Sequence, residues 1–539
     1  MRAAAALLVA ASLVAGCASL VPGAEVDAEG FAPRLFEGAL FHEEDLILAH
    51  GERLHADVYL PDGPLAPGAP SRFPAILVLS PYWGAGTSGA PLGFLPYDFL
   101  VTRLVPRGYA VVYGDLPGAG GSSGCWDDMG PVEREGAAAM VEAVAAQPWS
   151  DGKVGMVGMS YDAISQVLAA SAAPPHLVTI VPAAPLTHAY GGVLQDGVRY
   201  GVGWRDVQLE YESGSLAPPG TNQERYPGWT ERVVASPPCV AENHLGDPPT
   251  GAYTEYFAAR DLRAHGTNVR ASVFYMQGFL DANVKPDNFG AWFDAVPTLK
   301  KAWLGAWPHA YPTARGAGRD DMYLTIHRWL DHELKGIPNG IDSEPAIDVQ
   351  DQLGRWRHES AWPPPDATPR AFALGAASFG LASDAAIPLD APEGLHVSGA
   401  PELRLRVASD RPLGRVIARL YDGDALVSQG AFDLLFAGGL DEPRPLSPGK
   451  PVDVTLHLYP TDHEVAVGSP LRLVLATKDA GDWYEDDASG ATLTLASGTL
   501  TLPTVHRGDE DVFLVSCGAP AKPPVPACFR ALSDRGTGP

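Results

Sequence analysis

Two different hydrophobic patterns divide the chain near residue 360. In the first part, short runs of purely apolar residues such as Ala75–Leu79 and Tyr109–Tyr113 alternate with stretches of helical periodicity such as Glu133–Ala146. Strands that are apolar on both faces and separated by helices are typical of a mostly parallel sheet with helices on both sides. We therefore predict an α/β domain over residues 41–360, preceded by a linker over residues 18–40.

The alternation of strands and helices is interrupted between Pro185 and Leu262. This stretch is rich in Gly, Pro, Tyr and Trp, and it contains no clear strand pattern. An insertion of this length in an α/β domain usually folds over the ligand cleft. We therefore predict a helical cap over about residues 185–262.

From about Asp366 the apolar positions follow a period of two. Alternating runs such as Leu403–Val407 and Leu471–Ala476 are separated by turn dipeptides, and no helical periodicity is present. Many short strands of this kind predict an all-β sandwich or jelly roll, here over residues 366–505. The proline-containing segment Trp356–Pro365 is the predicted hinge between the two domains, and residues 506–539 are a Pro-rich tail.

The N-terminus has the pattern of an export signal. Met1-Arg2 is followed by the apolar run Ala3–Ala15, which is too short to be a permanent membrane span, and then by Gly16-Cys17. Val14-Ala15-Gly16-Cys17 resembles the lipobox of bacterial lipoproteins, in which the Cys is lipidated. We expect residues 1–17 to be a lipoprotein signal, and the protein to be exported and held in the cell envelope through Cys17. The alternative is an ordinary signal peptide that contains a Cys.

The overall charge argues against one class of partner. Lys and Arg total 38 against 64 Asp and Glu, which gives a net charge of −26. A nucleic-acid-binding protein needs a basic face, so we expect no nucleic-acid partner and contact with the membrane only through the lipid anchor.

The cysteines beyond Cys17 are compatible with two disulfides. Export permits disulfide formation, and an even number of four cysteines remains. Cys517 and Cys528 lie close together and are the first predicted pair, which leaves Cys125 with Cys239 by elimination. No Cys or His group has the spacing of a zinc site, so we expect no metal and no cofactor.

A serine lies at a predicted junction between a strand and a helix. In Gly158-Met159-Ser160-Tyr161-Asp162, a sharp turn would push the Ser160 hydroxyl out of the sheet and aim the Tyr161 backbone N–H at a developing oxyanion. Asp162 occupies the position of the last Gly in the usual G-x-S-x-G motif. The alternative is a serine in an ordinary turn.

A serine nucleophile requires a histidine base and an acid that orients the histidine. In this fold the acid and then the histidine follow the serine along the chain, each after a later strand. Asp281 and His309 both meet that requirement, since each follows a short apolar run. His327 and His332 fall within a predicted helix, where we expect them on the surface.

Several segments resemble one family. Trp149–Tyr161 resembles the serine turn of the Xaa-Pro dipeptidyl-peptidase and cocaine-esterase family of α/β-hydrolases, whose pattern is G-x-S-Y-x-G. This chain has Ala163 in place of the final Gly. Gly120–Asp127 also resembles the peptidase branch of the family. So does Asp281–Pro286, although Ala282 replaces the usual Trp of Asp-Trp-Asn-Val.

The predicted sandwich also resembles the family's C-terminal domain, including the segment Gly468–Leu473. Together these resemblances cover about residues 40–505. They imply Ser160 as the nucleophile, Asp281 as the orienting acid and His309 as the general base. Tyr82 matches a family Pro-Tyr whose hydroxyl helps to form the oxyanion hole, beside the backbone N–H of Tyr161.

Three functions remain open from the sequence. The first is an exported dipeptidyl-peptidase of Xaa-Pro type, which needs a carboxylate for the substrate ammonium. The cap offers four acidic candidates: Asp196, Asp206, Glu210 and Glu212. The second is a carboxylesterase, or an α-amino acid ester hydrolase or acylase, of the same family. The third is a non-catalytic surface binding protein. The expected ligand is a peptide or a small ester or amide, and the oligomeric state is left open.

Overall fold

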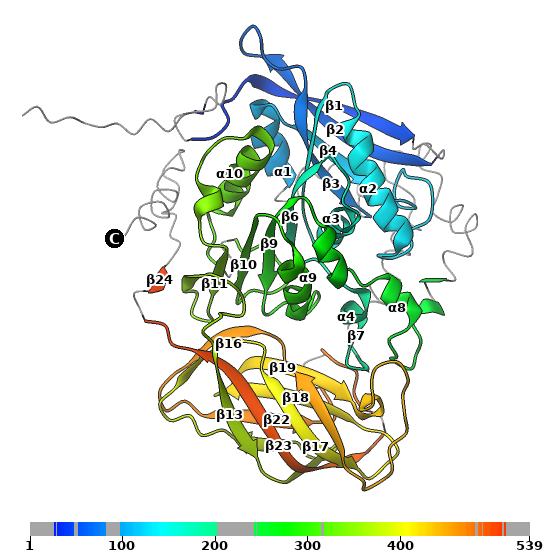
Figure 1. Cartoon of the computed structure of the whole chain (residues 1–539), viewed down its shortest axis with the longest axis vertical. Helices are drawn as coiled ribbons and strands as arrows, with labels where there is room; N and C mark the ends of the chain where they lie inside the picture. Colours follow the sequence, from blue (N-terminus) through cyan, green and yellow to red (C-terminus); the bar gives the residue numbers. More distant parts are fainter. Residues whose placement is uncertain are drawn as a thin grey trace, which may run out of the picture.

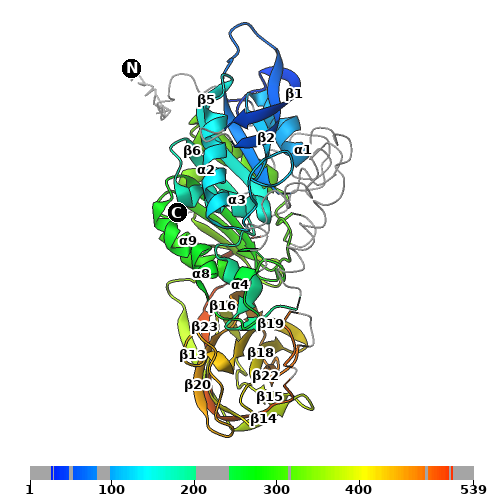
Figure 2. The same cartoon turned by 90° about the vertical axis from the view of Figure 1, so that its right-hand side faces the viewer.

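The computed structural model describes residues 26–27, 30–47, 52–81, 97–201, 242–243, 245–313, 317–479, 483–487, 489–508 and 511–513. Over these residues an α/β domain stands on a β-sandwich (Figure 1). Seen from the side, the two domains are stacked end to end (Figure 2).

One large sheet forms the centre of the α/β domain. Within the described residues it has eleven strands in the order β1-β2-β4-β3-β5-β6-β9-β10-β11-β12-β24. The strands are β1 (Phe36–Ile47), β2 (Arg53–Pro64), β3 (Phe73–Ser80), β4 (Ala110–Asp115), β5 (Ser150–Met159), β6 (Leu177–Ala183), β9 (Ser272–Gly278), β10 (Lys300–Gly305), β11 (Ile347–Gln350), β12 (Trp356–Glu359) and β24 (Val512–Phe513). The seven strands from β4 to β11 in this order are parallel, and the strands at both edges are antiparallel.

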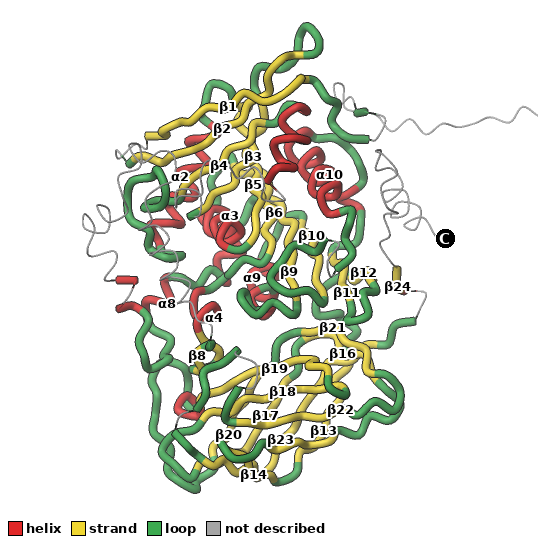
Figure 3. The backbone as a smooth tube through the Cα atoms, turned by 180° about the vertical axis from the view of Figure 1, so that it is seen from behind, coloured by secondary structure: helices red, strands yellow, loops and turns green. Residues whose placement is uncertain are grey.

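Helices cover both faces of this sheet, as Figures 1 and 3 show. The main ones are α1 (Tyr97–Phe99), α2 (Pro131–Ala145), α3 (Tyr161–Ala172), α9 (Gly290–Ala295) and α10 (Met322–Lys335). Alternate residues of β3 enter different cores: Leu77 and Leu79 pack with α2, α3 and α9, whereas Ile76 and Val78 pack with α1 and α10. The predicted α/β-hydrolase class, with its mostly parallel sheet buried on both faces, is confirmed.

The predicted cap is described only in part. Residues 202–241 lie outside the described residues. The flanking parts contain α4 (Ala189–Val193), β7 (Leu194–Gln195), β8 (Val198–Arg199), α8 (Glu255–Ala259) and η3 (Arg263–Asn268). Elsewhere in the described residues, the short helical turns are η1 (Leu100–Leu104), η2 (Val105–Arg107), η4 (Pro286–Asn288), η5 (Ile341–Ser343) and η6 (Leu434–Phe436).

The second domain is the predicted all-β sandwich. Its larger sheet contains β13 (Thr368–Leu374), β14 (Ala377–Gly380), β16 (Leu395–Gly399), β17 (Glu402–Ser409), β20 (Val452–His457), β21 (Thr461–Val465) and β23 (Thr492–Val505). The smaller sheet contains β15 (Ala385–Pro388), β18 (Arg415–Asp422), β19 (Ala425–Asp433) and β22 (Leu471–Ala476). Side chains with period-two burial, such as Leu403, Leu405 and Val407, fill the core between the sheets.

Three predicted segment boundaries are wrong. β1 begins at Phe36 inside the predicted linker, Trp356–Glu359 is strand β12 inside the predicted hinge, and Val512–Phe513 is strand β24 inside the predicted tail. β12 has no apolar run because Arg357 and Glu359, both buried, face polar partners at the junction of the two domains.

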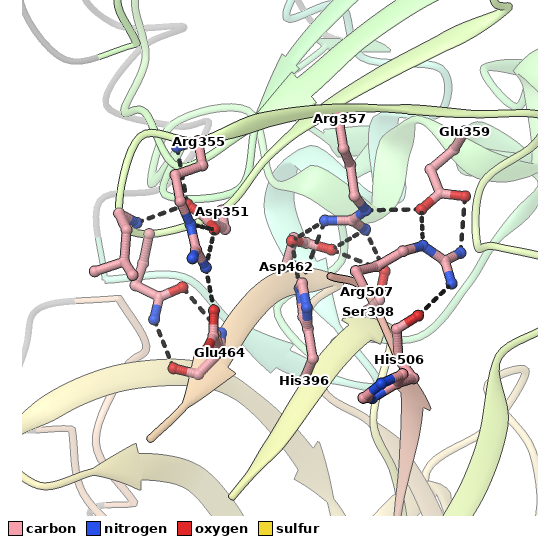
Figure 4. A network of polar contacts seen from close by, with 12 residues as sticks. Asp351, Arg355, Arg357, Glu359, His396, Ser398, Asp462, Glu464, His506 and Arg507 are labelled. Atoms are coloured by element: carbon pink, nitrogen blue, oxygen red, sulfur yellow. Dashed lines mark hydrogen bonds and ion pairs between the residues drawn. The ribbon is translucent and has the colours of Figure 1, made fainter. Parts of the chain in front are cut away.

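A buried ion-pair network joins the domains at β12 (Figure 4). The Arg357 guanidinium donates to both carboxylate oxygens of Asp462 on β21, at 2.5 Å each, and to Glu359 at 2.7 Å. Ser398 donates to Asp462 at 2.8 Å, and His396 lies 2.8 Å from the same carboxylate. Arg357 and Asp462 are nearly inaccessible to solvent, so the network fixes the sandwich against the hydrolase sheet.

The structure leaves most of the targeting and disulfide predictions untested. The predicted signal, including Cys17, lies outside the described residues, as do Cys239, Cys517 and Cys528. Cys125 is disulfide-bonded, but the predicted pairing with Cys239 stays a prediction. In the part of the chain that the structure describes, no helix is long and apolar enough to cross a bilayer.

Candidate active site

Ser160 lies at a strained turn between β5 and α3. Its backbone has φ 62° and ψ −125°, in a region that favours glycine, and its side chain is half-buried. A Cβ atom at Gly158 would lie 2.5 Å from Cβ of Asp162, so the close approach of strand and helix requires glycine there. This is the sharp strand-to-helix turn that presents a nucleophile at the carboxyl edge of a parallel sheet.

Backbone hydrogen bonds link the turns at this edge. In each bond a backbone N–H donates to a backbone carbonyl oxygen. The donor and acceptor residues are Ser160 and Ala183 (2.9 Å), Ala184 and Met276 (2.8 Å), Phe279 and Gly305 (2.6 Å), and Leu280 and Trp307 (3.2 Å). The last two require close contact, since a Cβ atom at Gly278 would lie 2.1 Å from the Trp307 carbonyl oxygen. The turns after β5, β6, β9 and β10 are therefore held together.

Asp281 and His309 meet on two of these turns. Asp281 is fully buried, and its Oδ1 accepts the backbone N–H groups of Asn283 (2.9 Å) and Val284 (2.8 Å). Its Oδ2 lies 2.8 Å from Nδ1 of His309, whose side chain is 20% exposed. Because the carboxylate accepts a hydrogen bond from the Nδ1–H group, the neutral imidazole keeps Nε2 as the basic atom. An acid and a base of a serine hydrolase need this arrangement.

Tyr161 opens α3, where the first backbone N–H groups of a helix have no partner within the helix. Its side chain points into the interior: the hydroxyl donates to Glu133 (2.8 Å) and accepts from Nε1 of Trp126 (2.9 Å). Burial raises the pKa of Glu133 well above its ordinary value, and the charges of Asp127 and Asp128 add to that effect. This anchor behind the serine turn escaped sequence analysis, because Glu133 reads as one more charge on an amphipathic helix.

The predicted oxyanion donor Tyr82 lies outside the described residues, so its role stays a prediction.

The prediction that His327 lies on the helix surface is wrong. His327 is fully buried and stacks on Phe31 with ring centroids 4.4 Å apart, and Nε of Arg103 donates to its Nδ1. The N-terminal segment around Phe31 covers this face of α10, which the pattern of α10 alone cannot reveal. His327 belongs to the support of the sheet and not to the site.

One cluster of side chains outside the site consists of residue types that can bind metal ions. Glu43, His55 and Asp57 bring three ligand atoms within 4.8 Å of one another on the β1–β2 hairpin. His55 lies 3.3 Å from Asp45 and 3.5 Å from Asp57, and these carboxylates raise its pKa although burial opposes them. These carboxylates therefore favour the protonated form of His55, which cannot ligate a metal ion, and we assign no metal to the group.

Comparisons with known proteins agree with this geometry. The model of the X-Pro dipeptidyl-peptidase (S15) family matches residues 50–311, and that of the X-Pro dipeptidyl-peptidase C-terminal non-catalytic domain matches residues 385–512. A putative Xaa-Pro dipeptidyl-peptidase of Bacillus cereus is 27% identical over 479 residues, which are 77% of this chain and 79% of the relative.

Two further comparisons extend the picture. A putative serine esterase of Mycobacterium bovis is 25% identical over 66% of this chain and 65% of its own length. The crystal structure of a CocE/NonD family hydrolase from Staphylococcus aureus superposes with a TM-score of 0.71 at 16% identity, covering 87% of this chain and 94% of that one.

The fold and the serine turn define a serine hydrolase of the α/β-hydrolase class. Within that class, the chain belongs to the X-Pro dipeptidyl-peptidase (S15) family, whose catalytic and C-terminal domains it carries in order. Its activity is that of a peptidase or an esterase.

Proposed function

We propose that this chain is an Xaa-Pro dipeptidyl-peptidase that releases N-terminal dipeptides from peptides through an acyl-enzyme. The observation that carries the proposal is the match to both domains of that family on one chain, with Asp281 bonded to His309 beside the Ser160 turn.

The proposed chemistry uses one proton carrier. Nε2 of His309 accepts the Ser160 hydroxyl proton as the serine oxygen attacks the substrate carbonyl, while Asp281 holds the imidazole and stabilises its charged form. The backbone N–H of Tyr161 and the Tyr82 hydroxyl receive the developing oxyanion. His309 then protonates the leaving amine, and water releases the dipeptide from Ser160.

A candidate acceptor for the substrate ammonium lies near this machinery. Asp287 follows Asp281 by six residues in η4, and its side chain is exposed. Burial raises the pKa of Asp287 to about 6, with the charges of Lys285 and Arg263 opposing the rise. Burial and the charge of Asp287 together raise the pKa of Asp196 to about 6. Two such carboxylates favour a bound cation.

The test compares substrates with and without a free amine. Ala-Pro-p-nitroanilide should be cleaved, N-acetyl-Ala-Pro-p-nitroanilide should not, and Ser160→Ala should be the inactive blank. Asp287→Asn should lower kcat/KM for the free-amine substrate by about 10- to 100-fold, since a hydrogen bond to a charged group is lost. Asp294→Asn, which alters an exposed carboxylate on α9, should leave both values unchanged.

Turnover of p-nitrophenyl butyrate with neither anilide cleaved would instead establish the esterase alternative. The relative named as a putative serine esterase is the observation that keeps that alternative open.

We further propose that the enzyme is exported and anchored by a lipid on Cys17, on the strength of Val14-Ala15-Gly16-Cys17 after the apolar run. In a bacterial host the full chain should sediment with membranes, and Cys17→Ala should release it or stop its processing. Equal membrane association of both chains would contradict the anchor.

A further inference from the structure

Asp162 carries a buried carboxylate, two residues beyond Ser160, that the acyl-transfer steps do not use. It is the second residue of α3 and is 1% exposed. Its Oδ2 accepts a hydrogen bond from the Tyr97 hydroxyl, and the Ser80 side chain is hydrogen-bonded to the same carboxylate.

The two donors come from different elements. Ser80 is the last residue of β3, and Tyr97 is the first residue of α1. One turn further along α3, the Ser165 hydroxyl donates to the Leu79 carbonyl at 2.5 Å. The nucleophile helix is therefore tied to the end of β3 at two successive turns, and Asp162 also ties it to α1.

The end of β3 matters because it leads directly to a predicted catalytic group. Tyr82, the predicted oxyanion donor, comes two residues after Ser80. The distance between nucleophile and oxyanion donor must be held within a fraction of an ångström for the transition state to be stabilised.

We propose that Asp162 is a positioning residue whose ionised carboxylate sets the end of β3 against the Ser160 turn. The proposal rests on the serine hydrolase chemistry above, and it does not depend on whether the substrate is a peptide or an ester. Within the described residues Oδ1 of Asp162 has no hydrogen-bond partner, so Oδ2 is the acceptor. Protonation removes the negative charge that strengthens the bonds from Tyr97 and Ser80, and it thereby loosens this clamp.

The clamp should titrate within the working range. Burial raises the pKa of Asp162 to about 7, and its bonds with Ser80 and Tyr97 oppose that rise. Tyr311 also faces it, with a pKa raised well above 10, and Gln166 bonds to its backbone carbonyl. Because these neighbours are neutral at pH 7, proton uptake by Asp162 itself should switch the clamp.

The first variant is Asp162→Asn, assayed with p-nitrophenyl butyrate at the isosbestic wavelength of the product. We expect kcat to fall by about 10- to 100-fold, as for other small displacements of reacting groups, with KM within about twofold of the wild type. In the wild type, protonation of Asp162 near pH 7 should add a loss of about 10- to 100-fold to that caused by protonation of the general base, so log kcat/KM should fall with a slope above 1 in this range. In Asp162→Asn the slope should not exceed 1, because the carboxyl group that adds the second protonation is gone.

A matched control separates this role from the general cost of losing a buried carboxylate. Asp331 on α10 is fully buried and accepts from the Tyr109 hydroxyl (2.5 Å) and the Ala32 N–H (2.7 Å). Tyr109 precedes β4, at the edge of the sheet opposite Ser160. Asp331→Asn should therefore lower thermal stability while kcat and the slope stay unchanged.

If Asp162→Asn does not fold, Tyr97→Phe removes one donor and should reduce kcat several-fold, whereas Tyr109→Phe should not. Fluorophosphonate labelling of wild-type Ser160 checks the underlying chemistry separately. Normal labelling with an unchanged kcat or slope in the Asp162 and Tyr97 variants would overturn this proposal alone. A wild-type chain that does not label would overturn the serine chemistry and the positioning role together.

Discussion

Asp281→Asn is expected to lower kcat by about 10,000-fold while the protein stays folded. The Oδ1 atom that accepts from Asn283 and Val284 is retained in the asparagine, so the turn after β9 keeps its shape. The amide placed at Oδ2 would donate to Nδ1 of His309 and force the proton onto Nε2, where the base is needed. The measurement is kcat on the best substrate across the pH range, together with the thermal midpoint.

Asp351→Asn is the matched control for this experiment. Asp351 is also buried after a sheet strand, and its Oδ1 accepts from the backbone N–H groups of Leu353 (2.9 Å) and Arg355 (3.0 Å). No histidine is bonded to it in the described part of the chain. The kcat of the Asp351→Asn variant should stay at the wild-type level. A comparable loss of kcat in both variants would contradict the role given to Asp281.

The largest loss of stability is expected from Asp462→Ala. Removal of this carboxylate leaves the Arg357 guanidinium buried at the domain junction with Glu359 as its remaining acid partner. Breaking a buried ion pair from one side costs about 3 to 5 kcal/mol, and the Glu359 contact favours the lower end. The free energy of the first unfolding transition in guanidinium chloride measures the loss.

An exposed pair provides the comparison. Asp453 pairs with Arg406 at 2.8 Å on the sandwich surface, and Asp453→Ala should cost less than about 1 kcal/mol. The double change Arg357→Met with Asp462→Leu should recover much of the loss, since neither charge is then left buried. Equal losses for Asp462→Ala and Asp453→Ala would show that the junction is not held by the ion pair.

The same pair has a defined pH dependence. The Arg357 guanidinium and His396 hold the pKa of Asp462 well below its ordinary value of 3.8, although burial opposes them. A lowered pKa in the folded state means that its stabilising contribution is complete above about pH 5 and is lost as the pH falls further.

The class of fold and the positions of the site residues could be predicted because both depend on local pattern. Ser160, Asp281 and His309 each follow a short apolar strand, and the carboxyl ends of parallel strands meet at one edge. The hydrogen bond between Asp281 and His309 is the contact that this reasoning expects.

Features that could not be predicted depend on contacts between distant segments. The polar pattern of β12 indicates a hinge, and the pattern alone cannot show that Arg357 is buried. The partners that allow its burial lie on the sandwich, 41 and 105 residues away in the chain. The hydrogen bonds of Glu133 and Asp162 could not be predicted, since their tyrosine partners come from other elements. Residues 82–96 and 202–241, which contain Tyr82 and three of the four acidic cap candidates, lie outside the described residues.

The short strand β24 has a consequence for the order in which this protein is made. β24 is the last described strand, yet it pairs with β12 of the hydrolase sheet, with Arg357 opposite Val512. A ribosome must therefore complete the whole sandwich before that edge of the sheet can close. Until then β12 offers unpaired backbone groups to other chains. The sheet that begins with β1 is therefore completed only after the strands of the sandwich have been synthesised.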